Sequence, residues 1–160
     1  FRIFHQRIKM KKNDNDFHRH SSIDRCTVVE LPRHYDAEGS ISVVENVDGA
    51  PFSVRRVYYL YDVPADTCRG GHSHFALRQL IVAISGSFDV TVDDGARRKT
   101  ITLNRPYRAL YVDTGIWRTI DNFSSGAVCL VLASEPYDES DYVRDYGRFL
   151  ELTSEKRADK

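Results

Sequence analysis

The sequence predicts an all-β fold, a closed barrel or a two-sheet jelly roll, that ends in one α-helix. The first observation is a series of short segments rich in Val, Ile, Leu, Tyr and Phe, each bounded by Gly, Pro, Asp or Asn. The second is a change of pattern near residue 142, where apolar residues begin to recur at helical spacing. No internal repeat interrupts the series, so one sheet-based architecture is expected.

Eight segments have the composition of short strands, and they are residues 26–31, 42–46, 54–61, 79–84, 88–92, 99–103, 109–112 and 128–133. Residues 88–92 alternate apolar and polar side chains, as a strand with one solvent-facing side does. Asp94-Gly95 is a good hairpin turn, and residues 99–103 supply the returning strand. These three segments together predict an antiparallel hairpin.

The tail of the chain has a helical pattern. Large apolar residues recur at positions 142, 143, 146, 149 and 150. Acidic residues cluster just before them, at positions 138, 139 and 141, where a helix N-terminus favours negative charge. We therefore expect one C-terminal helix lying against a sheet, and we interpret the acidic cluster as helix-start chemistry rather than as a catalytic carboxylate pair.

A chain of 160 residues suits one domain with a sizeable core. We expect residues 23–160 to form that domain. Residues 1–22 are polar and charged with few large apolar side chains, which predicts a mobile leader. The only methionine is Met10, so part of the leader is expected to precede the natural start or to be foreign to it.

Composition excludes several classes of function. The formal net charge is zero, so nothing favours binding to nucleic acid or to an anionic membrane. No apolar run is long enough to span a bilayer. Cys26, Cys68 and Cys129 are widely spaced and form no Cys-x-x-Cys pair, which predicts reduced thiols and a cytoplasmic protein.

The most informative local feature is the tripeptide His72-Ser73-His74, which follows Arg69-Gly70-Gly71. Residues at i and i+2 of a strand point to the same side, so both imidazoles are expected to converge on one ligand. This spacing suits either a metal site or a pair of proton-transfer groups.

The spacing beyond the pair resembles the two-part signature of the cupin superfamily, a small jelly-roll barrel. Gln79 and Gly86 follow the histidines, and Gly115, Arg118 and Asn122 form the second part. Metal-binding cupins carry Glu where this chain has Gln79, and a third His where it has Arg118. Because arginine stays protonated and cannot ligate a metal, the sequence predicts no metal at this site.

Further segments narrow the resemblance to the sugar-nucleotide 3,4-ketoisomerases, which include WxcM-like proteins. These segments are residues 51–59, 69–74, 93–95, 110–112, 116–117, 123–125, 131–134 and 137–142. The resemblance runs from about residue 40 to residue 150. It implies a cupin fold, a homodimer, a substrate that is a dTDP-linked 4-keto-6-deoxyhexose, and activity without a metal or organic cofactor.

The residues themselves suit such chemistry. Moving a ketone between neighbouring sugar carbons requires a proton taken from one carbon and delivered to the other, through an enediol. Neutral imidazoles are suited to both steps near pH 7, which makes His72 and His74 the candidate acid–base groups. Tyr58 or Tyr59, together with Gln79, is expected to hydrogen-bond the developing oxyanion.

Arginines are the candidate binding residues. Arg56, Arg69 and Arg118 are expected to meet the diphosphate or the enediolate, because a guanidinium binds such oxygens in a fork. Trp117 is expected to pack in the barrel rather than to stack on thymine.

Arg118 also departs from the family pattern, which usually has an active-site histidine after the tryptophan. An arginine cannot relay a proton at physiological pH, although it can stabilise an anionic intermediate. Two alternatives to the ketoisomerase therefore stay open. One is a catalytically inactive sugar-nucleotide-binding cupin, and the other is a related cupin epimerase.

Overall fold

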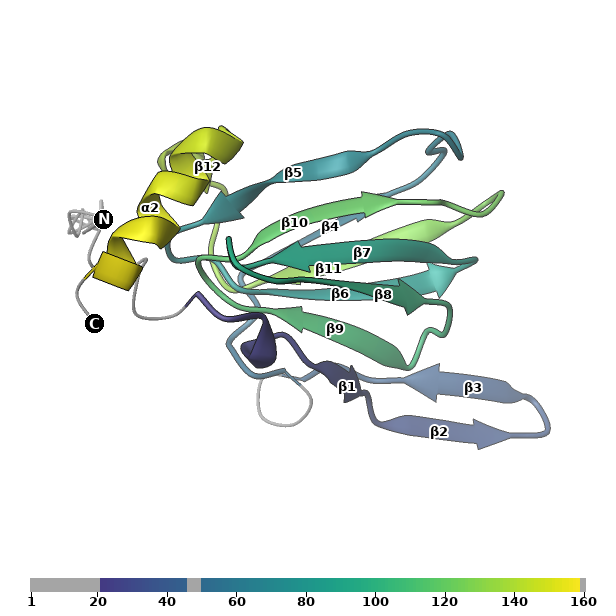
Figure 1. Cartoon of the computed structure of the whole chain (residues 1–160). Coiled ribbons are helices and arrows are strands. Elements are labelled where there is room, and N and C mark those ends of the chain that lie inside the picture. The colour runs from purple at the N-terminus through teal and green to yellow at the C-terminus, as the bar shows by residue number, and fades with distance from the viewer. Residues whose placement is uncertain (1–20, 46–49, 159–160) are drawn as a thin grey trace, which may run out of the picture.

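The computed structural model describes residues 21–45 and 50–158, with two five-stranded antiparallel sheets that face each other (Figure 1). The first sheet contains, in order, β1 (Val28–Glu30), β9 (Arg108–Val112), β6 (Gln79–Ser85), β11 (Val128–Ala133) and β4 (Arg56–Leu60). The second contains β12 (Tyr142–Val143), β5 (Arg69–His74), β10 (Trp117–Asp121), β7 (Phe88–Asp93) and β8 (Arg98–Leu103). The expected all-β fold with a C-terminal helix is confirmed.

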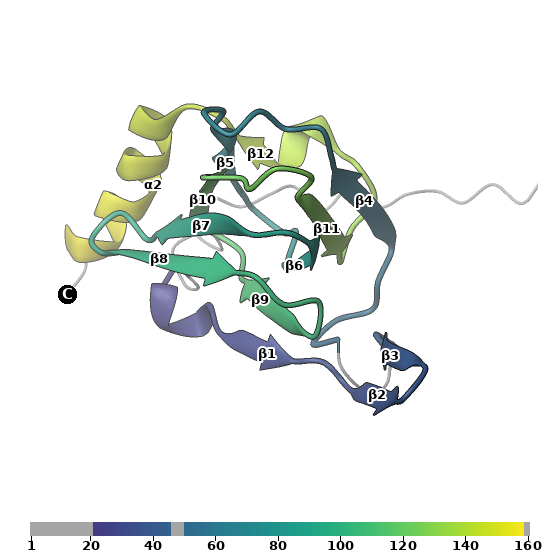
Figure 2. The same ribbon diagram turned by 90° about the vertical axis from the view of Figure 1, so that its right-hand side faces the viewer.

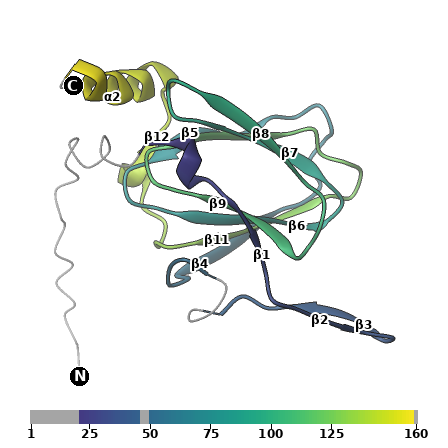
Figure 3. The same cartoon turned by 60° about the horizontal axis from the view of Figure 1, so that its bottom comes forward.

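The main core lies between the two sheets, whose strands are seen on either side of it in Figure 3. Inward-facing side chains of both sheets fill it, including Ile81, Val90 and Leu110. Strand β6 is buried on both faces, because Leu80 and Val82 belong to a second apolar cluster on the outer side of the first sheet. This double burial explains why β6 is a continuous apolar run.

The hairpin predicted around Asp94-Gly95 is confirmed. Strands β7 and β8 pair from Phe88 opposite Leu103 to Asp93 opposite Arg98. The Asp94 carboxylate accepts hydrogen bonds from the backbone N–H groups of Ala96 and Arg97, at 3.0 and 2.8 Å. The turn is therefore built by the local chemistry that the sequence indicated.

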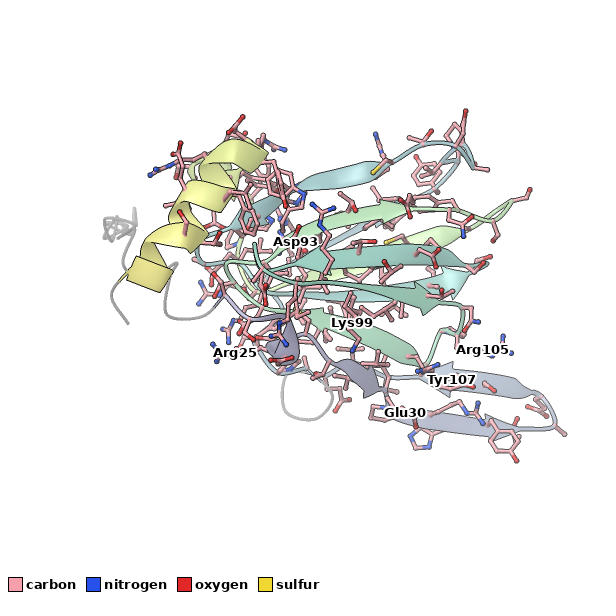
Figure 4. All side chains as sticks on the ribbon, in the orientation of Figure 1. Arg25, Glu30, Asp93, Lys99, Arg105 and Tyr107 are labelled. Atoms are coloured by element: carbon pink, nitrogen blue, oxygen red, sulfur yellow. The ribbon has the colours of Figure 1, made fainter. Side chains whose placement is uncertain are left out.

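The strand expected over residues 42–46 is wrong. The structure instead has a hairpin of β2 (Arg33–Asp36) and β3 (Gly39–Ser42), and residues 46–49 lie outside the described part. Every residue of the hairpin is exposed, so no alternation of buried and exposed positions marked it in the sequence. It projects away from both sheets (Figures 1 and 2). At its base, the Arg33 guanidinium lies 4.5 Å from the ring centre of Tyr107, which is labelled in Figure 4.

The C-terminal helix is confirmed, but its start is not where the acidic cluster indicated. Residues Glu139–Asp141 form a short 3-10 helix, η2, which is followed by β12 and then by α2 (Tyr146–Ala158). Asp138 caps η2 by accepting a hydrogen bond from the backbone N–H of Ser140. The acidic residues thus begin a different, shorter helix.

Helix α2 packs against the outer face of the second sheet. Phe149 and Leu152 are fully buried there, and Trp117 of β10 contacts Phe149 with 5.5 Å between ring centres. The Tyr146 hydroxyl donates to the Asp93 carboxylate at 2.7 Å, which ties the helix to the end of β7. Asp93 is labelled in Figure 4. Trp117 is therefore a packing residue, but it packs between the second sheet and the helix and not inside the barrel as expected.

Two further expectations concern the leader and membrane-spanning segments. The leader predicted over residues 1–22 lies almost entirely outside the described residues, which begin with Ser21 and the 3-10 helix η1 (Ile23–Arg25). Among the helices of the described residues, none has the length and apolar character needed to cross a membrane.

Candidate active site

A cavity of about 280 Å³ opens between the two sheets, and it contains most of the candidate residues. Strands β4, β5, β6, β10 and β11 and the segment before β5 contribute its walls, which are Tyr58, Leu60, Cys68, Arg69, Gly70, His72, Gln79, Ile81, Arg118, Ile120 and Val131. A separate groove of about 330 Å³ lies on the outer side of the first sheet, next to the β2–β3 hairpin. None of the candidate residues lines that groove, so the cavity between the sheets is the candidate active site.

Strand β5 brings the two histidines together. Their ring centres are 4.9 Å apart with the rings nearly perpendicular, which confirms that both lie on one side of the strand. His72 lines the cavity and is partly buried, whereas His74 is completely buried and does not line it. The structure therefore gives the two imidazoles different positions.

A glycine before the pair allows β5 to approach β10. Gly70 has a φ of +81°, and a Cβ atom placed on it would lie 2.9 Å from the backbone oxygen of Arg118. The pairing of β5 with β10 shifts register between Arg118 and Thr119 at this place. The local backbone, and hence the direction of His72, depends on a residue without a side chain.

Asp141 is the functional candidate that was not anticipated from the sequence. Its Oδ2 atom lies 3.1 Å from Nδ1 of His74, and both side chains are buried. The same carboxylate accepts hydrogen bonds from the backbone N–H groups of Ala76 and Leu77, at 2.9 and 3.2 Å. The interpretation of Asp141 as helix-start chemistry missed this contact, because 67 residues separate the two partners.

Arg118 is a buried cation on β10. Only 1% of the residue is exposed, and its Nη1 donates to the backbone oxygen of His72 at 3.3 Å. The Nε and Nη2 atoms have no hydrogen-bond partner among the described residues. Burial lowers the pKa of Arg118 to about 10, so the side chain stays charged at neutral pH. An uncompensated buried charge of this kind favours an anionic ligand.

Burial and the Arg118 charge keep both histidines neutral. Burial, with the Arg118 and His74 charges adding to it, lowers the pKa of His72 to about 3. Burial also lowers the pKa of His74 to about 4, although the hydrogen bond to Asp141 acts in the opposite direction. Both imidazoles are therefore unprotonated near pH 7, and each has a ring nitrogen that is buried without a partner in the described structure.

Tyr58 and Gln79 form a hydrogen-bonded pair at the cavity wall. The side-chain amide of Gln79 donates to the Tyr58 hydroxyl at 2.8 Å, and Gln79 Oε1 has no partner in the described part of the chain. Burial raises the pKa of Tyr58 to about 12, so the hydroxyl keeps its proton. Tyr59 points away and is 60% exposed, so Tyr58 is the tyrosine of the site.

The other two arginines differ in position. Arg69 is exposed at the mouth of the cavity, which it lines. Arg56 does not line the cavity: its guanidinium lies 5.2 Å from the ring centre of Tyr58 and 5.5 Å from that of Tyr137. Its Nε and Nη2 atoms are buried and unpartnered among the described residues. Tyr58 lines the cavity, and Arg56 contacts the Tyr58 ring without lining the cavity itself.

The ligand chemistry follows from these groups. The residues that the structure describes contain no cluster of three or more His, Cys, Asp or Glu side chains arranged to hold a metal ion. The cavity instead offers one neutral imidazole, an amide, a phenol and two guanidinium groups. Such a set suits an oxygen-rich anionic ligand.

The fold and site define a two-sheet β protein with a cavity between the sheets that is lined by an imidazole, an amide, a phenol and two guanidinium groups. Residues 24–154 match the family described as "FdtA: WxcM-like, C-terminal", and the chain belongs to this family. The expected family is thereby confirmed.

Two relatives are similar to this chain in sequence over most of its length. The TDP-4-oxo-6-deoxy-alpha-D-glucose-3,4-oxoisomerase of Aneurinibacillus thermoaerophilus is 41% identical over 122 residues, which is 76% of this chain and 88% of the relative. The solved structure of WlaRB, a TDP-quinovose 3,4-ketoisomerase from Campylobacter jejuni, is 41% identical with a TM-score of 0.77, covering 81% of this chain and 99% of that one.

A third relative was solved with ligands. QdtA, a sugar 3,4-ketoisomerase from Thermoanaerobacterium thermosaccharolyticum, is 34% identical in its complex with TDP, with a TM-score of 0.80 and coverage of 82% of this chain and 96% of that one. A QdtA variant with asparagine in place of a histidine was solved with TDP-4-keto-6-deoxyglucose.

Proposed function

We propose that this protein is a sugar-nucleotide 3,4-ketoisomerase that acts on a dTDP-4-keto-6-deoxyhexose. The observation that carries the proposal is the placement of a neutral imidazole, His72, and an unpaired buried cation, Arg118, in one cavity. The shared family and the activities of relatives at about 40% identity support the same reaction class.

The first step is removal of the proton from C3 by His72. The imidazole lines the cavity and is neutral at pH 7, as a general base must be. The electron pair of the C3–H bond forms the C3=C4 double bond, and the C4 carbonyl oxygen becomes negative. Arg118, with two unpartnered nitrogen atoms, stabilises this enediolate without giving up its proton.

The second step moves a proton between the oxygens and returns one to carbon. His74 does not line the cavity, but its ring centre lies 4.9 Å from that of His72, and in this proposal substrate binding brings it into reach of the sugar oxygens, where it moves a proton from the C3 oxygen to the C4 oxygen. The proton on His72 exchanges with water in the open cavity, and His72 then delivers a solvent-derived proton to C4. The C3 oxygen closes to a ketone as C4 is protonated, so no atom or electron is left over. The protonated hydroxyl of Tyr58, paired with Gln79, supplies a further hydrogen-bond donor to the oxyanion.

The nucleotide binds through arginines in this proposal. Arg69 is exposed at the mouth of the cavity, where a diphosphate that leads out of the site would pass. Arg56, behind Tyr58, carries buried unpartnered nitrogens and supplies a second positive charge. The reaction as written uses protein side chains alone, and we infer that no metal or organic cofactor takes part.

We infer that the protein acts as a homodimer in the cytoplasm. The strand β4 and β6 residues Val57, Tyr59 and Ile84 are large, apolar and 46–60% exposed on the first sheet. Tyr35 and Ile41 of the projecting hairpin are exposed as well. A second copy of the chain would cover these side chains. Light scattering at micromolar concentration is expected to give the dimer mass, and a monomer would contradict the inference.

The test of the function is a reaction in heavy water. The purified protein is incubated with dTDP-4-keto-6-deoxyglucose in D2O, and the product is read by NMR against a sample without protein. A ketoisomerase gives a 3-keto product. A product that keeps the C4 ketone but has an inverted neighbouring centre would instead identify an epimerase.

A second candidate function is sugar-nucleotide binding without turnover. The fixed charge of Arg118, which cannot relay a proton at neutral pH, favours it. Tight binding of the substrate with no exchange of carbon-bound hydrogen would support this function and overturn the ketoisomerase.

A further inference from the structure

We infer that Asp141 is a positioning residue that fixes the tautomer of His74, with the proton on Nδ1 and the lone pair on Nε2. The geometry of the contact carries this inference. The Oδ2 atom of Asp141 lies 3.1 Å from Nδ1 of His74, and neither side chain is more than 5% exposed. Only its catalytic consequence rests on the proposed function.

The Asp141 carboxylate is itself held in place. Its Oδ1 accepts from the backbone N–H of Ala76, and its Oδ2 accepts from that of Leu77. The backbone oxygen of Asp141 also accepts from the N–H of Phe75, so three hydrogen bonds join Asp141 to residues 75–77. A carboxylate whose oxygens already accept from two N–H groups presents an acceptor, not a donor, to the imidazole.

The other ring nitrogen of His74 has no such partner. Nε2 is buried and unpartnered within the described residues. The surroundings of the His74 ring are aromatic: its ring centre lies 4.3 Å from that of Tyr142 and 4.9 Å from that of His72. Because Asp141 determines where the imidazole proton sits, Nε2 is left as the nitrogen that accepts a proton.

The two histidines therefore differ in kind as well as in position. His72 Nδ1 has no hydrogen-bond partner in the described structure, and no described hydrogen bond joins His72 to a carboxylate. His74 is prepared to accept a proton at Nε2, and the resulting imidazolium is stabilised by Asp141. In the proposed reaction this is the group that carries the proton between the two sugar oxygens.

The informative substitution is Asp141→Asn. The side-chain amide retains the size of the carboxylate, but its NH2 group donates to Nδ1 and drives the proton to Nε2. Asp94→Asn is the matched control. Asp94 is also buried and also accepts from backbone N–H groups, those of Ile23, Ala96 and Arg97, yet no described hydrogen bond joins it to a histidine.

The primary readout is the tautomer itself, by long-range proton–nitrogen NMR on 15N-labelled protein, with His74 assigned from the His74→Asn spectrum. Wild type and Asp94→Asn are expected to show a bare Nε2, and Asp141→Asn a bare Nδ1. A wild-type His74 with its proton on Nε2 would overturn the inference even if Asp141→Asn fails to fold. An unchanged tautomer in a folded Asp141→Asn protein would overturn it as well.

Turnover separates this inference from the proposed function. Asp141→Asn is expected to lower kcat by about two to four orders of magnitude while TDP binding is retained. Asp94→Asn is expected to keep kcat within about threefold of wild type. If the tautomer changes as expected but wild type turns over no sugar nucleotide, the positioning role stands and the ketoisomerase fails. Equal losses in both variants would show that Asp141 acts only on the fold.

Discussion

Replacing Arg118 by methionine is expected to make the ligand-free protein more stable and the enzyme almost inactive. The side chain is 1% exposed and makes one described hydrogen bond, to the backbone oxygen of His72. Methionine is similarly long and unbranched, and it removes the charge while filling most of the space. The substitution therefore separates the effect of the buried charge on stability from its effect on activity.

The magnitude follows from the pKa of Arg118, which burial lowers to about 10. A lowering of roughly two and a half pH units, at 1.36 kcal/mol each, means that the buried charge costs about 3 kcal/mol. Loss of the hydrogen bond to the backbone oxygen of His72 lowers the free energy of unfolding by about 1 kcal/mol. The net expectation is a gain of about 2 kcal/mol, or roughly 4–8 °C in Tm for a chain of this length.

The assays are urea unfolding for stability and NMR-detected turnover for activity. Removing an oxyanion donor is expected to lower kcat by about 10²–10³-fold. Arg148→Met, on the exposed side of α2, is the control and is expected to change stability by less than about 0.5 kcal/mol. If Arg118→Met is less stable than wild type by more than about 1 kcal/mol, the charge is compensated in the free protein and the reasoning fails.

Four further results are expected. His72→Asn and His74→Asn should each lower turnover by about two to four orders of magnitude and leave TDP binding intact in calorimetry; wild-type turnover in both would refute their role. The pKa values of about 3 and 4 for these histidines lie below the unfolded value near 6.5. Between these values the unfolded state binds more protons than the folded state does. The free energy of unfolding should therefore fall as the pH drops from about 6.5 toward 4. For the same reason kcat/KM should show no inflection near pH 6.5 and should decline only below about pH 5; an inflection at 6.5 would show that the imidazoles are not buried as described. Gly70→Ala should cost at least about 2 kcal/mol in urea unfolding, because it adds a collision with Arg118 to the strain of a positive φ. Gly126→Ala, which has a similar φ and open space, should cost only about 1 kcal/mol, and equal costs would contradict the role of the close approach.

Local patterns were sufficient where sequence neighbours interact. The β7–β8 hairpin follows from alternation and a turn dipeptide, and the shared side of His72 and His74 follows from their spacing. Strand β10 was not predicted, because its inward positions are Arg118 and Ile120, and a charged residue in the core breaks the apolar alternation. Arg118 therefore both breaks the strand pattern of β10 and supplies the buried charge of the candidate site.

Contacts between distant segments could not be predicted from one sequence. Asp141 meets His74 only because β12 pairs with the end of β5, and nothing local marks a carboxylate as the partner of an imidazole 67 residues away. The exposed β2–β3 hairpin was missed for another reason. It has no buried positions, so no hydrophobic period distinguishes its strands from the residues that follow.

The most direct test of the central claim is the exchange of substrate hydrogen by wild type and His72→Asn. The claim is that a neutral His72 removes the C3 proton beside the buried charge of Arg118. In D2O, wild type is expected to incorporate deuterium at C4 of the product at the rate of turnover, while His72→Asn binds the substrate with unchanged affinity and incorporates it at least about a hundredfold more slowly. Equal incorporation by the two proteins, or none by wild type with substrate bound, would contradict the account.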